Sequence, residues 1–503
     1  MKRRAANFVS PLLVGVCVCA TLSAATTRSA VADESPCIQE LFTGFAVGLP
    51  AVPLPNGQPG SLGHIELHNQ VGSGRVITRA SLGEEQQIGD RFGAAIALAD
   101  IDGDNCVDVV VGAPGVDGGG AVYVIYGTRA GLGTGLSMRI PLPARPGDAF
   151  GKALAVESPI EQPNQRRPGR IWIGAPGRDV SGQANAGAVA YVEVVNRVAG
   201  TPRLFTQNSP GVPGQAEPGD RFGDELALLH STDFGAGGGV LVGQPSEDIG
   251  VRKDAGMVTV LPAPGDSPAG PGPYGVTEDT AGVPGAVEAG DRFGAAVDAF
   301  RGVGWVGVPG EDLGAVRDVG MVHGVTIGAT KVTSITYLRQ GQGNGVAIPG
   351  RPEAGDHFGA SVRAGRFGID DSPCSEAQVL IGVPGEDVGT IKDAGEAHSY
   401  LGRDSDFLCQ PGVGFNLGAN ARPGDRLGAA VASTREGGPD NVLIGVPGYD
   451  VATSVDAGVV LVGTCLWCEL SRPSPFFGSA QTTVYTQSDG AVSGARYGAV
   501  LNR

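Results

Sequence analysis

The amino-acid sequence predicts an all-β fold built from one repeated unit, and three observations lead to that prediction. A motif of the form Gly-Asp-x-aromatic-Gly recurs along the 503 residues. An apolar run that ends in Gly-x-Pro follows each of the first six copies. Glycine accounts for 84 residues, has no collagen-like period and is interleaved with Val, Ile, Leu and Ala. Such a composition is typical of turns between many short strands.

The motif divides the chain into units of similar length. Six clear copies begin at Gly89, Gly147, Gly219, Gly290, Gly355 and Gly424, and a seventh relative, GARYG, begins at Gly494. The residues at the aromatic position, spaced 58 to 72 residues apart, are Phe92, Phe150, Phe222, Phe293, Phe358, Leu427 and Tyr497.

Each unit offers about four short strands. The apolar runs that follow the motif end at Pro114, Pro176, Pro245, Pro309, Pro384 and Pro447. A glycine and a third apolar run come next, as in GAVYVIYG from Gly120. A single unit of this kind cannot bury its sheet alone, and four-stranded units repeated radially form a β-propeller.

These motifs resemble the FG-GAP repeats of integrin α-chain propellers and of their bacterial secreted relatives. The resemblance covers nearly all of the chain after the N-terminal segment, with six FG and GAP pairs in register. We expect the aromatic residue to pack between neighbouring blades, and the glycine beside it to permit close backbone approach. The Gly and Pro of GAP are expected to end a strand and enter a turn.

The ends of the chain predict how the ring closes. The last motif begins at Gly494 and leaves no room for three further strands. The segments GFAVGLPAV from Gly44, GSLGHIELHN from Gly60 and RVITRASL from Arg75 resemble the missing strands. We therefore predict seven blades in residues 33–503, the last shared between about 37–88 and 494–503. An open or six-bladed ring is the alternative.

Residues 1–32 have the features of a secretory signal peptide. Lys2, Arg3 and Arg4 precede an apolar run from about Phe8 to Ala25, and the small-x-small sequence ends at Ala32. A retained N-terminal anchor is the alternative. No other stretch is apolar enough to predict a membrane span. The expected location is extracellular, either free or associated with the cell surface.

Charge and cysteine content agree with export. Removing the four basic residues of 1–32 from the 36 in the chain leaves 32 against 52 acidic residues, a net charge of −20, which argues against nucleic acid as a partner. Arginine far outnumbers lysine, which suggests a GC-rich bacterial genome. Six cysteines remain, an even number that predicts disulfides. The expected pairs are Cys37 with Cys106, Cys374 with Cys409, and Cys465 with Cys468; a redox role for the last pair is the alternative.

The segment DIDGDNCVD predicts one calcium site, in blade one. The side chains of Asp100, Asp102, Asp104 and Asp108 and the backbone oxygen of Cys106 fall at alternate positions of a tight loop. Calcium takes about six to eight oxygen ligands, and such a loop directs them at one centre. The segment resembles the loops at the same place in integrin propellers, which hold calcium. The alternative is an Asp-rich hairpin turn without metal.

A second acidic pattern recurs between the second and third strands of four blades. Its members are Asp248, Asp254, Asp312, Asp318, Asp387, Asp393, Asp450 and Asp456. In one interpretation these carboxylates accept backbone N–H bonds and hold long hairpin loops. In the other, the loops line one face of the propeller and form an acidic rim that suits a basic or cation-bridged partner.

No motif in the sequence indicates a catalytic site. GxSxG and HExxH are absent, and the six histidines are scattered. We therefore expect a secreted, non-catalytic binding or adhesion module, monomeric, with an extracellular protein or glycan as ligand. An extracellular hydrolase that uses acidic loop residues is the alternative, and a structural matrix component is a third.

Overall fold

The computed structural model describes residues 44–54, 61–68, 74–162, 165–231, 237–265, 272–328, 330–343, 348–365, 378–401, 413–434, 441–463, 482–487 and 492–501. All of them belong to one compact unit, Pro36–Arg503. The predictions for the signal segment 1–32 and for Cys37, Cys374, Cys409, Cys465 and Cys468 lie outside the described residues.

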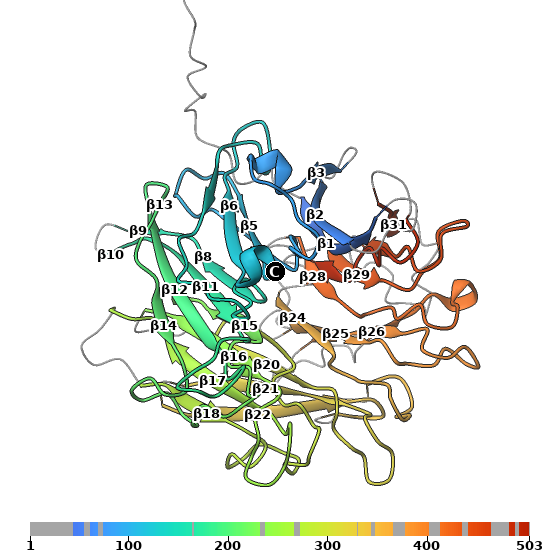
Figure 1. The fold of residues 1–503 in the computed structure, drawn as a ribbon. Helices are drawn as coiled ribbons and strands as arrows, with labels where there is room; N and C mark the ends of the chain where they lie inside the picture. Colours follow the sequence, from blue (N-terminus) through green and yellow to red (C-terminus); the bar gives the residue numbers. More distant parts are fainter. Residues whose placement is uncertain are drawn as a thin grey trace, which may run out of the picture. The chain divides into compact units, whose positions relative to one another are not determined.

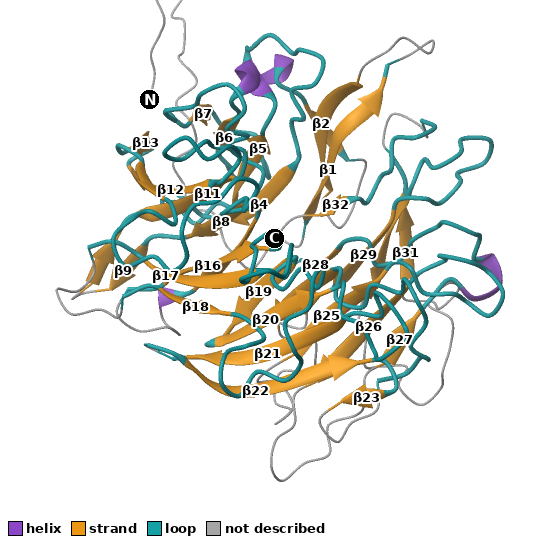
Figure 2. Ribbon diagram, turned by 60° about the horizontal axis from the view of Figure 1, so that its bottom comes forward, coloured by secondary structure: helices purple, strands orange, loops and turns teal. Residues whose placement is uncertain are grey.

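Seven antiparallel sheets of four or five strands form a ring, which confirms the seven-bladed β-propeller (Figure 1 and Figure 2). Blade 1 contains β4 Ala95–Ala99, β5 Asp108–Ala113, β6 Ala121–Ile125 and β7 Ser137–Arg139. Blade 2 contains β8 Leu154–Glu157, β11 Gly169–Ala175, β12 Ala188–Val195, β13 Val198–Ala199 and β14 Arg203–Phe205. Blade 3 contains β15 Glu225–Leu229, β16 Gly239–Gln244, β17 Met257–Pro262 and β18 Tyr274–Val276.

The remaining blades repeat the same strand order. Blade 4 contains β19 Ala296–Phe300, β20 Val303–Val308, β21 Met321–Ile327, β22 Val332–Arg339 and β23 Gln342–Gly343. Blade 5 contains β24 Ser361–Gly365, β25 Gln378–Val383, β26 Glu396–Leu401 and β27 Val413–Phe415. Blade 6 contains β28 Val431–Ser433, β29 Val442–Val446, β30 Val459–Gly463 and β31 Thr482–Tyr485. Blade 7 contains β32 Val500–Leu501, β1 Phe45–Pro53, β2 Ser61–His68 and β3 Arg75–Ile77.

Short elements outside the blades decorate the loops. The hairpin of β9 Ile160–Gln162 and β10 Gln165–Arg167 extends from blade 2. Three single 3₁₀ turns are described: η3 Ala80–Leu82, η4 Val116–Gly118 and η6 Gly418–Asn420.

The second strand of a blade is covered on both faces, and its sequence shows why. Every residue of β5, β16 and β25 is buried. A strand that packs against a neighbouring blade on each side reads as a continuous run of Val, Ile and Leu rather than an alternating pattern. This is why the GAP runs are the most apolar part of each repeat.

In six of the blades a glycine bridges to the residue at the aromatic position of the next motif. The bridges pair Gly120 with Phe150, Gly187 with Phe222, Gly256 with Phe293, Gly320 with Phe358, Gly395 with Leu427 and Gly458 with Tyr497. A Cβ built at Gly120 would lie 2.3 Å from the carbonyl oxygen of Phe150, and its φ is +94°. Only glycine fits such a position. The aromatic side chains are fully buried, so the prediction that they pack between blades is confirmed.

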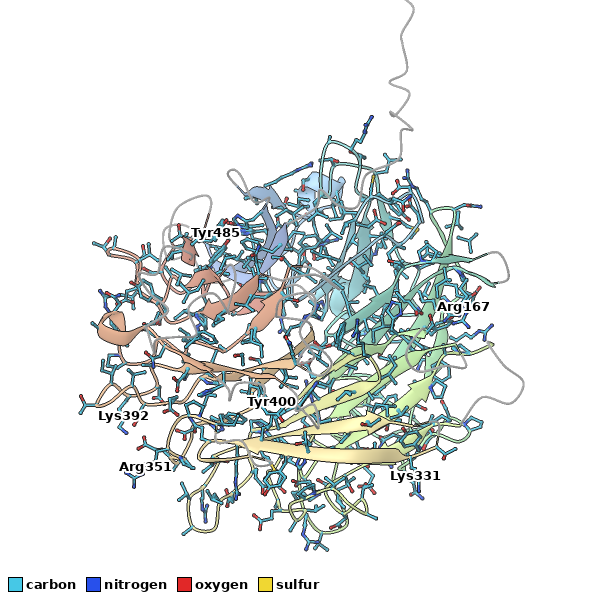
Figure 3. All side chains as sticks on the ribbon, turned by 180° about the vertical axis from the view of Figure 1, so that it is seen from behind. Arg167, Lys331, Arg351, Lys392, Tyr400 and Tyr485 are labelled. Carbon is cyan, nitrogen blue, oxygen red and sulfur yellow. The ribbon has the colours of Figure 1, made fainter. Side chains whose placement is uncertain are left out.

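The seventh blade is assembled from both ends of the chain, as the sequence predicts. Its strand order is β3-β2-β1-β32, with Val47 opposite Leu501 and Gly48 opposite Val500. Figure 1 shows the N-terminal strands beside those of the C-terminal blade. Tyr485 of β31 lies next to this blade, its ring centroid 5.0 Å from that of Phe45 (Figure 3). The alternative of six blades is wrong.

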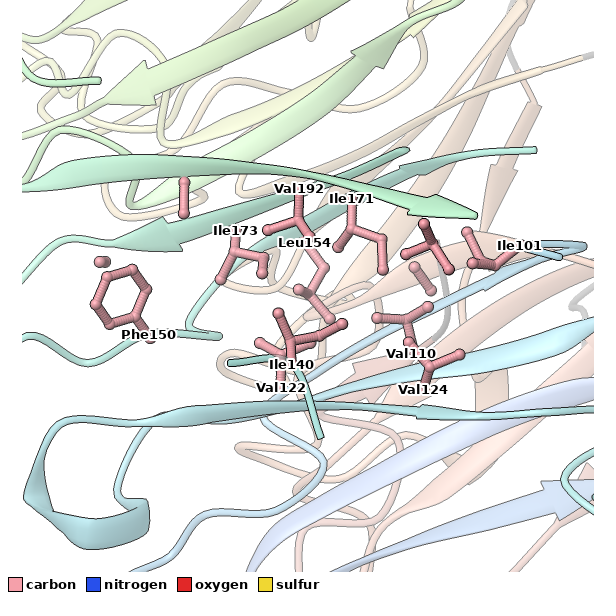
Figure 4. Close-up of a cluster of buried hydrophobic side chains, with 14 of the residues drawn as sticks. Ile101, Val110, Val122, Val124, Ile140, Phe150, Leu154, Ile171, Ile173 and Val192 are labelled. Atoms are coloured by element: carbon pink, nitrogen blue, oxygen red, sulfur yellow. The ribbon is translucent and has the colours of Figure 1, made fainter. Parts of the chain in front are cut away.

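Hydrophobic clusters between adjacent blades hold the ring together. Between blades 1 and 2, Val110 and Val122 face Leu154 and Ile173, with Phe150 at the edge (Figure 4). Similar clusters occupy the other interfaces. Each fully buried Val, Ile, Leu or Phe contributes about 1.5–3 kcal/mol relative to exposure, so the inter-blade surface carries most of the favourable free energy of folding.

Candidate functional site

The aspartate loop between β4 and β5 brings three carboxyl groups together. Carboxylate oxygens of Asp100, Asp102 and Asp108 lie within 4.8 Å of one another. Asp108 is the first residue of β5 and is fully buried, and Asp100, directly after β4, is also buried. The two paired strands therefore fix both ends of the loop, and Asp102 is carried between them.

Backbone N–H groups hold the loop in a tight turn. Gly103 and Asn105 donate to the two carboxylate oxygens of Asp100 over 2.8 and 2.9 Å. Cys106 donates from its backbone nitrogen to Asp104 Oδ1 over 2.7 Å. Gly103 and Asn105 have φ values of +81° and +64°, which glycine and asparagine adopt most readily. The loop is thus shaped by its own sequence.

Asp108 is held where a negative charge is costly. Its two oxygens accept hydrogen bonds from the backbone nitrogens of Ile101 and Gly127, each over 2.8 Å. Burial raises the pKa of Asp108 to about 8, and the charges of Asp102 and Asp100 add to this effect. A cation placed among these carboxylates would favour their ionised forms.

The loop residues fit a calcium ion. Its donors are hard carboxylate oxygens, and an oxygen that accepts one N–H retains a second lone pair for a metal. Asp100, Asp102 and Asp108 would hold the ion, and its charge would offset their mutual repulsion. The backbone oxygen of Cys106 stays a predicted ligand. The Cys106 side chain is disulfide-bonded, and because no other cysteine lies within the described residues, the pairing with Cys37 stays a prediction.

An arginine from blade 2 reaches the outer side of this loop. Arg197 donates from Nε to Asp102 and from Nη2 to Asp104 Oδ2, the latter over 3.0 Å. Its guanidinium lies 4.8 Å from the centroid of the Tyr126 ring. Arg197 occupies the tight turn between β12 and β13 with a φ of +63°. The cationic partner of the loop thus comes from a residue about 95 positions away, which the sequence pattern did not indicate.

The recurring acidic loops share one internal hydrogen bond. In each, the first aspartate accepts from the backbone nitrogen of the second, six residues later. The N–O distances are 3.0 Å for Asp254 to Asp248, 2.9 Å for Asp318 to Asp312, 3.1 Å for Asp393 to Asp387 and 3.0 Å for Asp456 to Asp450. The first aspartates therefore hold the hairpin loops, as one of the two interpretations expects.

The second aspartates have a different role in the backbone. Their φ values lie between +49° and +53°, the left-handed region. The backbone carbonyl of each accepts a hydrogen bond from the GDxFG motif of the next blade. For example, Arg292 donates its backbone N–H to the Asp254 carbonyl oxygen over 3.1 Å. The acidic loops and the GDxFG segments thus lie side by side. Each loop is fixed to its own blade and to the next.

Two of the loops carry their own cation. Lys253 pairs with Asp248 and Lys392 with Asp387. Figure 3 shows Lys392 at the periphery of the molecule. Burial acts to raise the pKa of Asp387, but the hydrogen bond from Lys392 holds it below the ordinary value. The rim is therefore less negative than a count of its aspartates implies.

Between blades lie buried polar clusters that the sequence analysis did not anticipate. We name each after the two blades it joins. The 2–3 junction contains Gln207, Asp220 and Glu247, and Gln207 Nε2 donates to Glu247 Oε2 over 2.7 Å. Burial and neighbouring negative charge raise the pKa of Glu247 to about 8. The amide is the partner that this buried carboxyl group requires.

Two other junctions also supply a side-chain donor. In the 4–5 junction, which contains Gln340, Asp356 and Glu386, Gln340 Nε2 donates to Glu386 Oε2 over 2.6 Å. In the 1–2 junction, Arg178 Nη1 donates to Asp148 Oδ2 over 2.6 Å. A buried acid is thus matched by an amide or a guanidinium.

The 3–4 junction consists of Glu278, Asp291 and Glu311. One carboxylate oxygen of each lies within 4.8 Å of the others. All three residues are buried. Burial, together with the charges of Glu311 and Asp291, raises the pKa of Glu278 to about 10, and burial raises that of Glu311 to about 7.

Comparison with known families agrees with this geometry. A model of the FG-GAP repeat matches residues 92–125, from the aromatic residue of the first motif to the end of β6. The match spans one repeat, and the glycine–aromatic bridge and the strand order of that repeat recur around the ring. The chain thus contains an FG-GAP repeat, and its other blades repeat the geometry of that repeat. No curated protein matches it significantly. Within the described residues of this FG-GAP repeat protein, no helix is long and apolar enough to span a membrane.

The structure brings some of the predicted site residues together and keeps others apart. Asp100, Asp102 and Asp108 converge, and Asp104 lies on the side occupied by Arg197. The eight rim aspartates lie in four separate loops, two in each. Glu278 was missed, although a comparison of repeats could have found it: TEDTAGVPG from Thr277 corresponds to TQNSPGVPG from Thr206.

A cavity lies on the ring axis of the FG-GAP repeat protein. Its volume is about 240 Å³, and the first strands of all seven blades line it, mostly with alanine and other small residues. Lys152 and Glu225 are the charged residues in this lining, and Lys152 Nζ lies 3.6 Å from Glu225 Oε1. The two charges therefore offset each other on the axis.

Proposed function

We propose that this FG-GAP repeat protein is an extracellular, calcium-stabilised binding protein that presents its loop-bearing face to a protein or glycan. The observation that carries the proposal is the four acidic hairpin loops, each fixed internally by the same aspartate hydrogen bond. No observation on the described residues favours the hydrolase alternative.

Rigidity supports a binding role for these loops. Asp318 donates its backbone N–H to Asp312 within the loop and accepts an N–H from His357 of the next blade over 3.1 Å. Equivalent bonds fix the loops of blades 3, 5 and 6. A surface held in this way loses little conformational entropy when a ligand binds, which favours affinity.

The chemistry of the face suggests the kind of ligand. Asp254, Asp318 and Asp393 are exposed, and Val251, which shares the blade 3 loop with Asp254, is 92% exposed. A row of exposed carboxylates attracts basic groups or ligands bridged by a cation. We therefore expect a ligand with basic side chains, or an anionic glycan held through bound calcium.

Calcium has a structural part in this proposal. The aspartate loop joins the first and second strands of blade 1, whereas the rim loops join second and third strands. The two kinds of loop therefore lie at opposite ends of their strands. A calcium ion would stiffen the aspartate loop and its contact with blade 2 without touching the ligand.

The test is retention on glycan and matrix-protein arrays by purified protein. The triple variant Asp254→Asn, Asp318→Asn, Asp393→Asn should lose retention. Glu193→Gln is the matched control, because Glu193 lies near the end of its blade 2 strand that is farther from the rim loops. This variant should still be retained on the array. Equal retention by both variants, or no retained ligand for the natural sequence, would contradict the proposal.

A further inference from the structure

The 3–4 junction departs from its neighbours at a single position. In the 2–3 junction Gln207 donates to Glu247, and in the 4–5 junction Gln340 donates to Glu386. Glu278 stands at the corresponding position of the 3–4 junction. It follows β18, as Gln207 follows β14 and Gln340 follows β22.

A close glycine shows that these side chains occupy the same place. A Cβ built at Gly214 would lie 2.6 Å from Gln207 Nε2, and one at Gly285 would lie 2.6 Å from Glu278 Oε1. At Gly350 the corresponding distance, to Gln340 Nε2, is 2.4 Å. The head groups of the two glutamines and of Glu278 are therefore held against the same backbone turn in three successive junctions.

The change from amide to carboxylate removes the donor. Neither carboxylate oxygen of Glu278 accepts a hydrogen bond from an N–H or hydroxyl group among the described residues, although the residue is 4% exposed; its neighbour is the Asp291 carboxyl group, with which it can share a proton. Glu311 Oε2 likewise has none within that part of the chain. Arg339 is the basic group that acts on Glu311, whereas Glu288 and Asp312 add negative charge. Three buried acids thus meet where the neighbouring junctions hold two acids and an amide.

A histidine points into the same cluster. His323 of β21 is fully buried, and its Nε2 lies 3.4 Å from Glu278 Oε1. Neither ring nitrogen has a hydrogen-bond partner among the residues that the structure describes. An imidazole ring is a metal ligand through an unprotonated nitrogen, and His323 Nε2 is the ring atom that faces Glu278.

We propose that Glu278, Asp291 and Glu311, whose carboxylate oxygens meet, form a second cation site for a divalent transition metal such as Mn²⁺ or Zn²⁺, and that His323, which contacts Glu278, completes it when the ion binds. Carboxylates combined with an imidazole suit these ions, whereas calcium prefers oxygen ligands alone. Glu278 comes from blade 3 and the other three residues from blade 4. The ion would therefore tie two blades together. This inference is independent of the proposed ligand face.

The first test removes the site. Purified protein carrying Asp102→Asn and Asp104→Asn, which disable the aspartate loop, is equilibrated with MnCl₂ or ZnCl₂ and its bound metal is counted by mass spectrometry and Mn²⁺ EPR. We expect one bound equivalent, which is lost when Glu278→Gln is added. Without metal, Glu278→Gln should raise the melting temperature, because the amide can donate to Glu311. His323→Thr, which introduces the residue type of blade 3, should weaken Zn²⁺ binding.

The second test builds the site elsewhere. His398 of β26 occupies in blade 5 the strand position of His323, and its ring lies near Phe358 as that of His323 lies near Phe293. His398 Nε2 lies 3.3 Å from Glu396 Oε2, whereas blade 4 has Met321 at that strand position. Gln340→Glu combined with Glu396→Met should therefore complete an equivalent set with Asp356 and Glu386 and add one bound equivalent. The proposal is overturned if the loop-disabled protein binds no Mn²⁺ or Zn²⁺, or if Glu278→Gln leaves the count unchanged. In either case Glu278 holds a proton rather than sharing a metal.

Discussion

Arg197 Nη2 donates to Asp104 Oδ2 over 3.0 Å and thereby joins the aspartate loop of blade 1 to a turn of blade 2. The arginine and a calcium ion would offset the same negative charge. We predict that Arg197→Gln lowers stability by roughly 0.5–1 kcal/mol without calcium, the range for partly exposed ion pairs. The loss should shrink in millimolar calcium. Urea unfolding under both conditions measures it; an equal loss in both would show that the two cations do not compete.

Calcium itself should stabilise the protein. Adding millimolar CaCl₂ to metal-free protein is predicted to raise the melting temperature, because the ion relieves repulsion among Asp100, Asp102 and Asp108. Asp102→Asn should reduce that rise, because Asp102 is one of the three converging carboxylates. Asp117→Asn changes an exposed acid of the same blade and should leave it intact. Differential scanning calorimetry gives the comparison, and a calcium response that survives Asp102→Asn would argue against the loop as the site.

Ring closure depends on a glycine in the first strand of the chain. A Cβ at Gly48 would lie 2.1 Å from the Gly93 carbonyl oxygen and 3.0 Å from the Val500 side chain. Gly48→Ala should therefore destabilise the protein by roughly 1–3 kcal/mol or more. Gly272→Ala is the matched control, since no atom lies within 4 Å of its Cβ position. Urea unfolding should separate the two variants; similar midpoints would mean that blade 7 does not close as described.

Stability should depend on pH through the buried acids of the junctions. Burial raises the pKa of Glu247 from 4.5 to about 8; Asp220, Glu217 and Asp248 add to the shift, and Gln207 opposes it. The folded state therefore binds the proton more tightly than the unfolded state. Its contribution to stability is fully present below about pH 4.5 and is lost as pH rises through about 8.

The measurement is the free energy of unfolding in urea between about pH 5.5 and 8.5. Stability should fall with rising pH over this range, and Glu247→Gln should flatten the fall, because an amide at that position does not titrate. An unchanged slope in the variant would assign the pH dependence to other groups.

The architecture could be predicted from the sequence because each repeat contains the same short motifs, which determine its turns and strands locally. Two glycines recur about every 58–72 residues: the glycine of the motif, such as Gly93, and the bridging glycine, such as Gly120. Both adopt a positive φ, which only glycine adopts readily. The aspartate loop is equally local, since Asp100 to Asp108 fold on themselves. The closure of the ring followed from the same pattern, because the last motif lacked its partner strands.

The electrostatic partners could not be predicted in this way. Arg197 meets Asp104 across 93 positions, and nothing beside either residue marks the contact. Glu278 precedes Asp291 by 13 positions, as Gln207 precedes Asp220, so aligning these two repeats reveals the equivalent position; what the alignment does not reveal is that the acid there is buried without a donor.

By itself, the sequence determined the number of blades, their strand order, the closing strand and the position of the aspartate loop, since these depend on local backbone conformation and on periodic apolar runs. Only the tertiary structure decided which charges face one another between blades and which acids are buried without a donor. The physical reason is that burial and the charges brought near by packing set the cost of an ionised group, and both arise only when blades from distant parts of the chain meet.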